Sequence, residues 1–198
     1  IIYSELVMTS QIFAGVDEVG RGCLAGPVVS VAIILEKSID RRVMVDSKKI
    51  SHKKRVELSQ YILRHARSIG VGICDNHIID KINIHNATLE SMKKAIINLD
   101  LIPEIAYIDG KFIPNTDIKC KSIIKGDEKI PQISAASIIA KVTRDKLIKK
   151  MSKKFTKYAW DKNAGYGTKF HLEAIKKFGI TIYHRKKFGP IHNILSPN

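Results

Sequence analysis

The fold is decided by the stretch Ile12-Phe13-Ala14-Gly15-Val16-Asp17-Glu18-Val19-Gly20-Arg21-Gly22, in which a short apolar run ends at two carboxylates and a glycine-rich turn. A second apolar run follows, from Val28 to Leu35. Both runs have the length and the β-branched content of strands, and a glycine-rich connection separates them. They predict two neighbouring strands, the first of which ends in charged side chains.

Helices and further strands alternate along the rest of the chain. Ser51 is a predicted N-cap for a helix that runs to about Ala66, because serine side chains accept hydrogen bonds from the first turn. Pro103 is expected to end a second helix, since proline cannot continue one. The remaining predicted strands are Ser68 to Cys74, Ile105 to Asp109 and Asp117 to Ile124, and the remaining predicted helices are about Ala87 to Leu99, about Ile133 to Lys154 and near Lys169 to Phe178.

This order of elements predicts an α/β fold built on a mixed sheet. Neither a repeat nor a linker divides the chain, so residues 1–198 are expected to form one domain. Its least regular segment, from Tyr158 to Asn198, is expected to form a small C-terminal part. Trp160 either packs that part or contacts a substrate.

The composition narrows the class of partner. The 34 Lys and Arg residues outnumber the 19 Asp and Glu residues, which gives a formal net charge of +15 and indicates a polyanionic partner. The longest largely apolar run, Val28 to Leu35, is too short to span a bilayer, so a membrane-inserted protein is excluded. Three widely spaced cysteines, Cys23, Cys74 and Cys120, match neither a zinc site nor a disulfide framework, and they are expected to be reduced thiols in a cytoplasmic protein.

Carboxylates recur where apolar runs end. Asp17-Glu18, Asp109 and Asp127 each lie beside a glycine or just before a glycine-containing loop. A charge that directly follows a buried strand needs a partner, and convergence on a cation would supply one. Oxygen ligands without Cys or His favour Mg²⁺ or Mn²⁺ over zinc. In a basic protein, such a site indicates metal-assisted phosphodiester chemistry.

A structural interpretation of the same carboxylates stays open on the residues alone. Asp17 and Asp109 are also typical of residues that cap turns. Asp127 has the weakest case, because Lys125 to Lys129 resembles an exposed turn in which Glu128 is its rival.

The segment Asp17 to Gly22, followed by Leu24-Ala25-Gly26-Pro27, resembles the N-terminal signature of the ribonuclease HII family. A motif of this length is specific. The resemblance covers roughly residues 12 to 170 in the family's order. Its further blocks are Asp46-Ser47-Lys48-Lys49, Asp109-Gly110, Lys125-Gly126-Asp127, Ala135 to Asp145 and Gly165-Tyr166-Gly167-Thr168.

The resemblance implies a ribonuclease H-like fold, with a five-stranded mixed sheet flanked by helices and a small C-terminal helical part. It also implies an endonuclease that cuts the RNA strand of RNA-DNA hybrids and cuts duplex DNA 5′ of an embedded ribonucleotide, leaving 5′-phosphate and 3′-hydroxyl ends. The four carboxylates Asp17, Glu18, Asp109 and Asp127 would bind two divalent ions, Mn²⁺ or Mg²⁺, one activating water and the other stabilising the leaving oxygen. An obligate protein partner is not expected, and a monomer is sufficient.

Substrate recognition is expected at the loop Gly20-Arg21-Gly22. Glycines lack a Cβ, so the backbone there can approach a sugar and hydrogen-bond its 2′-hydroxyl, while Arg21 holds the adjacent phosphate. The resemblance further implies that Tyr166 packs on the next deoxyribose and that Ser47 and Lys48 contact the nucleic-acid backbone. The alternatives are a plain tight turn for the glycines, a core tyrosine at 166 and a solvated surface at 47–48.

The long helix contributes further basic residues. Lys141, Arg144 and Lys146 are expected to face the nucleic acid, whereas Asp145 is expected to be structural. The histidines show no metal-ligand spacing, and none is a catalytic candidate. Two other classes of protein remain as alternatives: a non-catalytic RNA-binding protein, and a two-metal nuclease that acts on branched DNA or all-RNA substrates.

Overall fold

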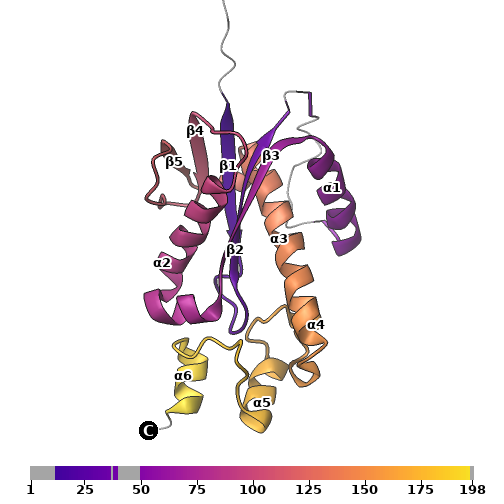
Figure 1. The fold of residues 1–198 in the computed structure, drawn as a ribbon. Helices are drawn as coiled ribbons and strands as arrows, with labels where there is room; N and C mark the ends of the chain where they lie inside the picture. The colour runs from indigo at the N-terminus through magenta and orange to yellow at the C-terminus, as the bar shows by residue number, and fades with distance from the viewer. Residues whose placement is uncertain (1–11, 37, 40–49, 197–198) are drawn as a thin grey trace, which may run out of the picture.

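A five-stranded sheet forms the centre of the computed structural model, which describes residues 12–36, 38–39 and 50–196 (Figure 1). The strand order is β3-β2-β1-β4-β5, in which β1 pairs antiparallel with β2 and parallel with β4. This mixed sheet confirms the predicted α/β class. The strands are β1 Phe13–Val19, β2 Val28–Leu35, β3 Ala66–Cys74, β4 Ile105–Asp109 and β5 Cys120–Ile123.

Helices cover both faces of the sheet (Figure 1). Every residue of β2 is buried, because alternate side chains point to two covered faces. Val31 and Ile33 pack with α1 and α3, whereas Ala32 and Ile34 pack with α2. The helices are α1 His52–Arg64, α2 Asn76–Ile97, α3 Pro131–Ser152, α4 Trp160–Asn163, α5 Lys169–Phe178 and α6 Gly189–Leu195, with short 3-10 turns η2 at Gly126–Glu128 and η3 at Thr156–Tyr158.

The predicted second helix is wrong in its bounds. Helix α2 begins at Asn76, where the Asp75 side chain accepts a hydrogen bond from the Ile78 amide. It bends at Asn83, whose φ of 66° breaks the helical path and whose Oδ1 then accepts from the Asn86 amide. The sequence pattern therefore captured only the part that follows this internal cap. The helix ends at Ile97, so Pro103 does not terminate it.

Other predicted elements agree more closely with the structure. Ser51 caps α1, accepting from the Lys54 amide at 3.3 Å. The strand predicted from Asp117 to Ile124 is shorter, since only Cys120–Ile123 pairs with β4. None of the helices among the described residues is long and apolar enough to cross a membrane.

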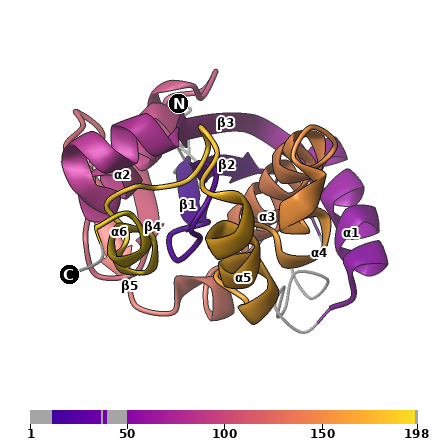
Figure 2. The same ribbon diagram turned by 90° about the horizontal axis from the view of Figure 1, so that it is seen from below.

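The C-terminal segment packs against the loop that follows β1. Trp160, Ile175 and Ile191 form a buried cluster with Leu24 and Ala25 of that loop. Seen from below, α5 and α6 flank the β1–β2 connection (Figure 2). Trp160 is 1% exposed, so of its two predicted roles the structure supports packing.

Candidate active site

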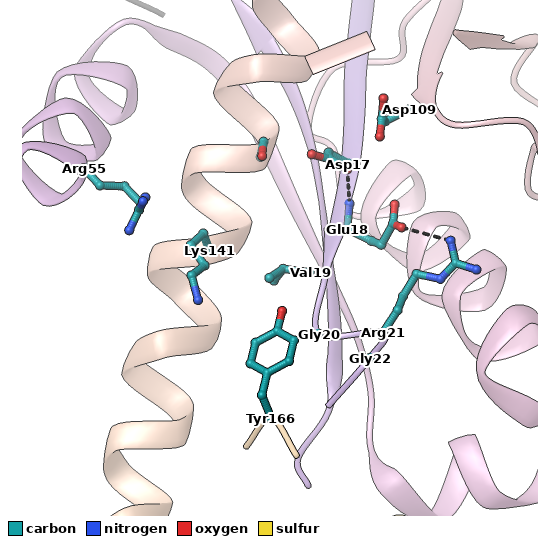
Figure 3. A pocket seen from close by; sticks show the side chains of 11 residues that line it. Asp17, Glu18, Val19, Gly20, Arg21, Gly22, Arg55, Asp109, Lys141 and Tyr166 are labelled. Atoms are coloured by element: carbon teal, nitrogen blue, oxygen red, sulfur yellow. Dashed lines mark hydrogen bonds and ion pairs between the residues drawn. The ribbon is translucent and has the colours of Figure 1, made fainter. Parts of the chain in front are cut away.

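A cavity of about 480 Å³ opens at the carboxyl end of β1 (Figure 3). Its lining combines carboxylates, cations, a glycine-rich loop and one exposed aromatic ring. The lining residues are Asp17, Glu18, Val19, Gly20, Arg21, Gly22, Arg55, Asp109, Ser137, Lys141 and Tyr166.

Parallel pairing brings the first carboxylates together. Val16 of β1 is in register with Ile108 of β4. Asp17 and Asp109, the next residue of each strand, therefore lie side by side toward the carboxyl ends of two adjacent parallel strands. The N-terminal turn of α3 lies directly over β1, because a Cβ on Gly15 would be 2.2 Å from the Gln132 carbonyl carbon. This close approach places Ser137 of α3 within hydrogen-bonding reach of the Asp17 carboxylate.

Asp127 lies beside this group without lining the cavity. The Gly126 amide donates to Asp109 Oδ1 at 2.7 Å, which ties η2 to the end of β4. Asp127 is 7% exposed, whereas its sequence rival Glu128 is exposed. The buried side chain argues against an exposed turn at position 127, and the role predicted for Asp127 as a metal ligand stays a prediction.

Burial and like charge destabilise the ionised carboxylates. Burial raises the pKa of Asp17 well above its ordinary value, and the charges of Glu18 and Asp109 raise it further. Burial also raises the pKa of Glu18, an effect opposed by Arg21, whose Nη1 lies 3.3 Å from Glu18 Oε1. A bound cation would relieve this repulsion.

The chemistry of the donors fits a hard divalent cation, since the carboxylates that line the cavity offer oxygen ligands. Among the described residues, however, no group of three or more His, Cys, Asp or Glu side chains is arranged so that it could hold a metal ion. The carboxylates Asp17, Glu18 and Asp109 share one cavity, and Asp127 follows Gly126, whose amide donates to Asp109.

The two glycines of the predicted recognition loop, Gly20-Arg21-Gly22, serve different purposes. Gly20 has a φ of +95°, and a Cβ there would lie 2.2 Å from Arg144 Nε, so the fold itself requires this glycine. At Gly22 a Cβ would meet nothing nearer than Tyr166 Cε1, at 3.9 Å. Packing therefore does not demand a glycine at 22, which leaves close approach by a ligand as a reason for it.

Tyr166 lies beside that loop and faces the cavity (Figure 3). An isolated antiparallel bridge joins it to Cys23, and the residue is 41% exposed, so it is not a core tyrosine. His171 holds the backbone of this segment, since its ring nitrogen Nδ1 lies 2.8 Å from the Tyr166 carbonyl oxygen. Ser47 and Lys48 lie outside the described residues.

The prediction that Arg144 faces the nucleic acid is wrong. Its side chain is fully buried, and its guanidinium donates to the carbonyls of Pro27, Ala25 and Ala164 at 2.8 to 3.1 Å. Backbone carbonyls thus satisfy the buried charge. The sequence held a signal for this, since Arg144 continues the buried i, i+4 stripe on α3 that consists of Ala136, Ala140 and Ile148.

Lys141 and Arg55 supply cations that do reach the cavity. Lys141 is paired with Asp145 at 2.8 Å, which confirms the structural role expected of Asp145. Arg55 comes from α1 and was not singled out from the sequence, because nothing distinguishes it from its basic neighbours. Both cations also line a second cavity of about 710 Å³ between α1, α3 and α4, together with Lys146, Lys149 and Lys162.

Comparisons with known proteins agree on one family. The family model described as Ribonuclease HII matches residues 14–190. The chain is 53% identical over 186 residues to the ribonuclease HII of Pelagibacter ubique, covering 93% of this chain and 100% of that protein. It is 52% identical over 185 residues to the ribonuclease HII of Leuconostoc mesenteroides, covering 93% of this chain and 73% of that protein.

Solved structures show the same fold. Ribonuclease H2 of Pyrococcus horikoshii superposes with a TM-score of 0.79 at 24% identity, covering 93% of this chain and 97% of that one. The RNase HII in the PCNA complex from Archaeoglobus fulgidus gives a TM-score of 0.76 at 29% identity, covering 89% and 95%. The matched residues span the sheet, the carboxylate cavity and most of the C-terminal segment, so the chain belongs to the ribonuclease HII family and is a ribonuclease H enzyme.

Proposed function

We propose that this ribonuclease H cuts the RNA strand of RNA-DNA hybrids and also cuts duplex DNA 5′ of a single embedded ribonucleotide, using two divalent ions and leaving 5′-phosphate and 3′-hydroxyl ends. Endonuclease activity on RNA-DNA hybrids follows from membership of the ribonuclease HII family. The observation that carries the finer proposal is the grouping of Asp17, Glu18 and Asp109 in a cavity whose other walls are cations and a glycine-rich loop.

The proposed ligands are Asp17, Glu18, Asp109 and Asp127, and the proposed ions are Mn²⁺ or Mg²⁺. Such ions, when bound, activate an attacking water and stabilise the charge that develops on the leaving oxygen. A protein of the same fold, Bst-RNase HIII, was crystallised with Mn²⁺. In this chain, the raised pKa of Asp17 and of Glu18 reflects crowded, buried carboxylates that a cation would stabilise.

The side chains around the ligands are suited to a sugar-phosphate backbone. Arg21, Arg55 and Lys141 line the cavity and would attract the phosphodiester toward carboxylates that would otherwise repel it. The second cavity continues this cationic path along α3 and would hold the backbone beyond the cut site. Gly22 leaves room for a ribose, and the exposed ring of Tyr166 offers a surface on which the next sugar packs.

Cleavage of a DNA duplex that contains one ribonucleotide tests the proposal. With Mg²⁺ or Mn²⁺ present we expect a single cut on the 5′ side of the ribonucleotide, and none after the metal is chelated. Asp109→Asn is expected to abolish cutting and to leave the protein folded, as checked by circular dichroism. Asp117→Asn is the matched control, because Asp117 is an exposed aspartate outside the cavity.

Several outcomes would contradict this assignment. Full activity in the Asp109→Asn variant would refute the proposed site. A protein that cuts hybrids but leaves the single-ribonucleotide duplex intact would refute the finer substrate. Binding without cleavage in any metal would favour the non-catalytic RNA-binding alternative, and cleavage of all-RNA or branched DNA would favour the other nuclease class.

A further inference from the structure

A buried arginine from the C-terminal segment holds the recognition loop. Arg185 lies between α5 and α6 and is fully buried. Its Nη2 donates to the Gly20 carbonyl at 2.7 Å and its Nη1 to the Arg21 carbonyl at 2.8 Å. Its Nε donates to the Gly26 carbonyl at 3.0 Å, so one guanidinium spans both ends of the turn after β1.

Burying the charged guanidinium of Arg185 costs desolvation free energy that burying a neutral side chain would not cost. Burial lowers the pKa of Arg185 to about 10, which still leaves it charged at neutral pH. The ring of Phe188 lies against the guanidinium, with 5.0 Å between Cζ and the ring centroid, and restricts its tilt. The planar donors are therefore presented to the loop in one orientation, which a lysine ammonium would not reproduce.

The carbonyls that Arg185 binds fix the direction of two amide groups. The Gly20 carbonyl shares a peptide plane with the Arg21 N–H, and the Arg21 carbonyl shares one with the Gly22 N–H. These peptide bonds are trans, so each N–H points opposite to its carbonyl and away from Arg185. Gly20, Arg21 and Gly22 line the cavity and Arg185 does not, so the two N–H groups are directed to the cavity side.

Both amide groups are available to a ligand. Among the described residues no hydrogen-bond acceptor is assigned to the N–H of Arg21 or of Gly22. The space beside Gly22 is open as far as the Tyr166 ring. A pair of aligned N–H donors without protein acceptors is suited to the oxygens of a sugar or a phosphate.

We propose that Arg185 is a positioning residue for ribonucleotide recognition, which aims the N–H groups of Arg21 and Gly22 at the sugar-phosphate oxygens of the ribonucleotide. The inference rests on the proposed function, since it takes a ribonucleotide-containing duplex as the substrate. It gives the segment after Phe178 a role in substrate choice. Arg185 acts through the loop and does not touch the reacting atoms.

Binding measured in an Asp109→Asn background, where the substrate survives, tests the inference. The Kd is measured by fluorescence anisotropy for a duplex with one ribonucleotide and for the all-DNA duplex of the same sequence, with Mg²⁺ present. Arg185→Lys is expected to reduce the preference for the ribonucleotide duplex about tenfold, the loss of roughly one good hydrogen bond. Its affinity for all-DNA should change less than about twofold, because phosphate attraction is untouched.

Ile191→Ala is the matched control. Ile191 is fully buried in the apolar cluster of the C-terminal segment and offers no donor to the loop carbonyls. We expect this variant to lower the melting temperature and to keep the ribonucleotide preference. A preference that survives in Arg185→Lys would overturn the inference, and so would an equal loss in Ile191→Ala. Equal binding of both duplexes by the parent protein would instead refute the proposed function on which the inference depends.

A second measurement needs no change at Arg185 and serves if Arg185→Lys does not fold. In the Asp109→Asn protein, the amide resonances of Arg21 and Gly22 are followed by nuclear magnetic resonance during titration with each duplex. The ribonucleotide duplex should shift both resonances more than the all-DNA duplex does. Equal shifts with the two duplexes would overturn the inference.

Discussion

Acid should destabilise this protein through a buried pair of histidines in its C-terminal segment. His171 and His184 are fully buried, and their Nε2 atoms lie 3.1 Å apart. Thr181 N–H donates to His184 Nδ1 at 2.8 Å, so the ring proton of His184 is on Nε2. Trp160 Nε1 donates to His171 Nε2 at 2.9 Å, so that atom is an acceptor. Both rings are therefore neutral, and a further proton on either would face a donor.

The size of the effect follows from the pKa of His184, which burial and the neighbouring His171 lower from 6.5 to about 4. In the unfolded chain this histidine takes up a proton near its ordinary pKa, whereas in the folded chain it does not until about pH 4. The contribution of His184 to the free energy of unfolding is therefore fully present above the ordinary histidine pKa, and it is lost as the pH falls from that pKa to about 4. The full loss is about 3 kcal/mol, of which about 2 kcal/mol is gone by about pH 5.

Urea unfolding at about pH 7 and about pH 5 measures this loss. The parent protein should lose about 2 kcal/mol more over this range than His184→Gln, which cannot take up the proton. The comparison with a variant is needed because the raised pKa values of Asp17 and Glu18 make the folded protein more stable as the pH falls, which opposes the effect of His184. His192 is exposed, so His192→Gln should behave like the parent. Equal losses in the parent and in His184→Gln would refute the argument.

Four further substitutions probe the cavity. Asp17→Asn should abolish cleavage yet raise the melting temperature in chelator, because it removes a buried charge from a crowded group; a lower melting temperature would contradict this. Lys141→Ala should weaken duplex binding and reduce the slope of log K against log salt by about 1. Loss of its partly exposed ion pair with Asp145 should change the free energy of unfolding by less than about 1 kcal/mol. An unchanged salt slope would exclude a phosphate contact of Lys141. Gly22→Ala should melt at the same temperature as the parent protein but cut the single-ribonucleotide duplex at least about tenfold more slowly. Gly20→Ala should instead lower the melting temperature. Parental cleavage rates in Gly22→Ala would show that no ligand needs the space beside Gly22.

The sequence predicted the elements that local patterns encode. Apolar runs of strand length marked β1, β2 and β4 to within two residues at each end, because both faces of these strands are buried or half-buried. The N-cap Ser51 marked the start of α1. The bend in α2 escaped prediction, because the sequence pattern does not mark Asn83 as the residue that adopts a φ of 66°.

The candidate site was predictable as a set of residues and not as an arrangement. Motif spacing singled out Asp17, Glu18 and Asp109, which the fold gathers in one cavity. Arg55 was missed, because it comes from α1 and its approach to the cavity depends on how that helix packs on α3. Asp127 was the weakest member of the same pattern and was also implied by the resemblance, and only the structure separates its buried side chain from the exposed Glu128.

The sequence by itself determined the fold class, the basic surface and the family, because composition, strand periodicity and motif order are properties of the chain. Only the tertiary structure decided which backbone carbonyls, from segments far away in the sequence, hold the buried Arg144 and Arg185. A charged side chain carries no local mark of the partners that will surround it. Its burial is stable only once the fold has brought those carbonyls to it, so the scaffold behind the recognition loop becomes visible only in the folded chain.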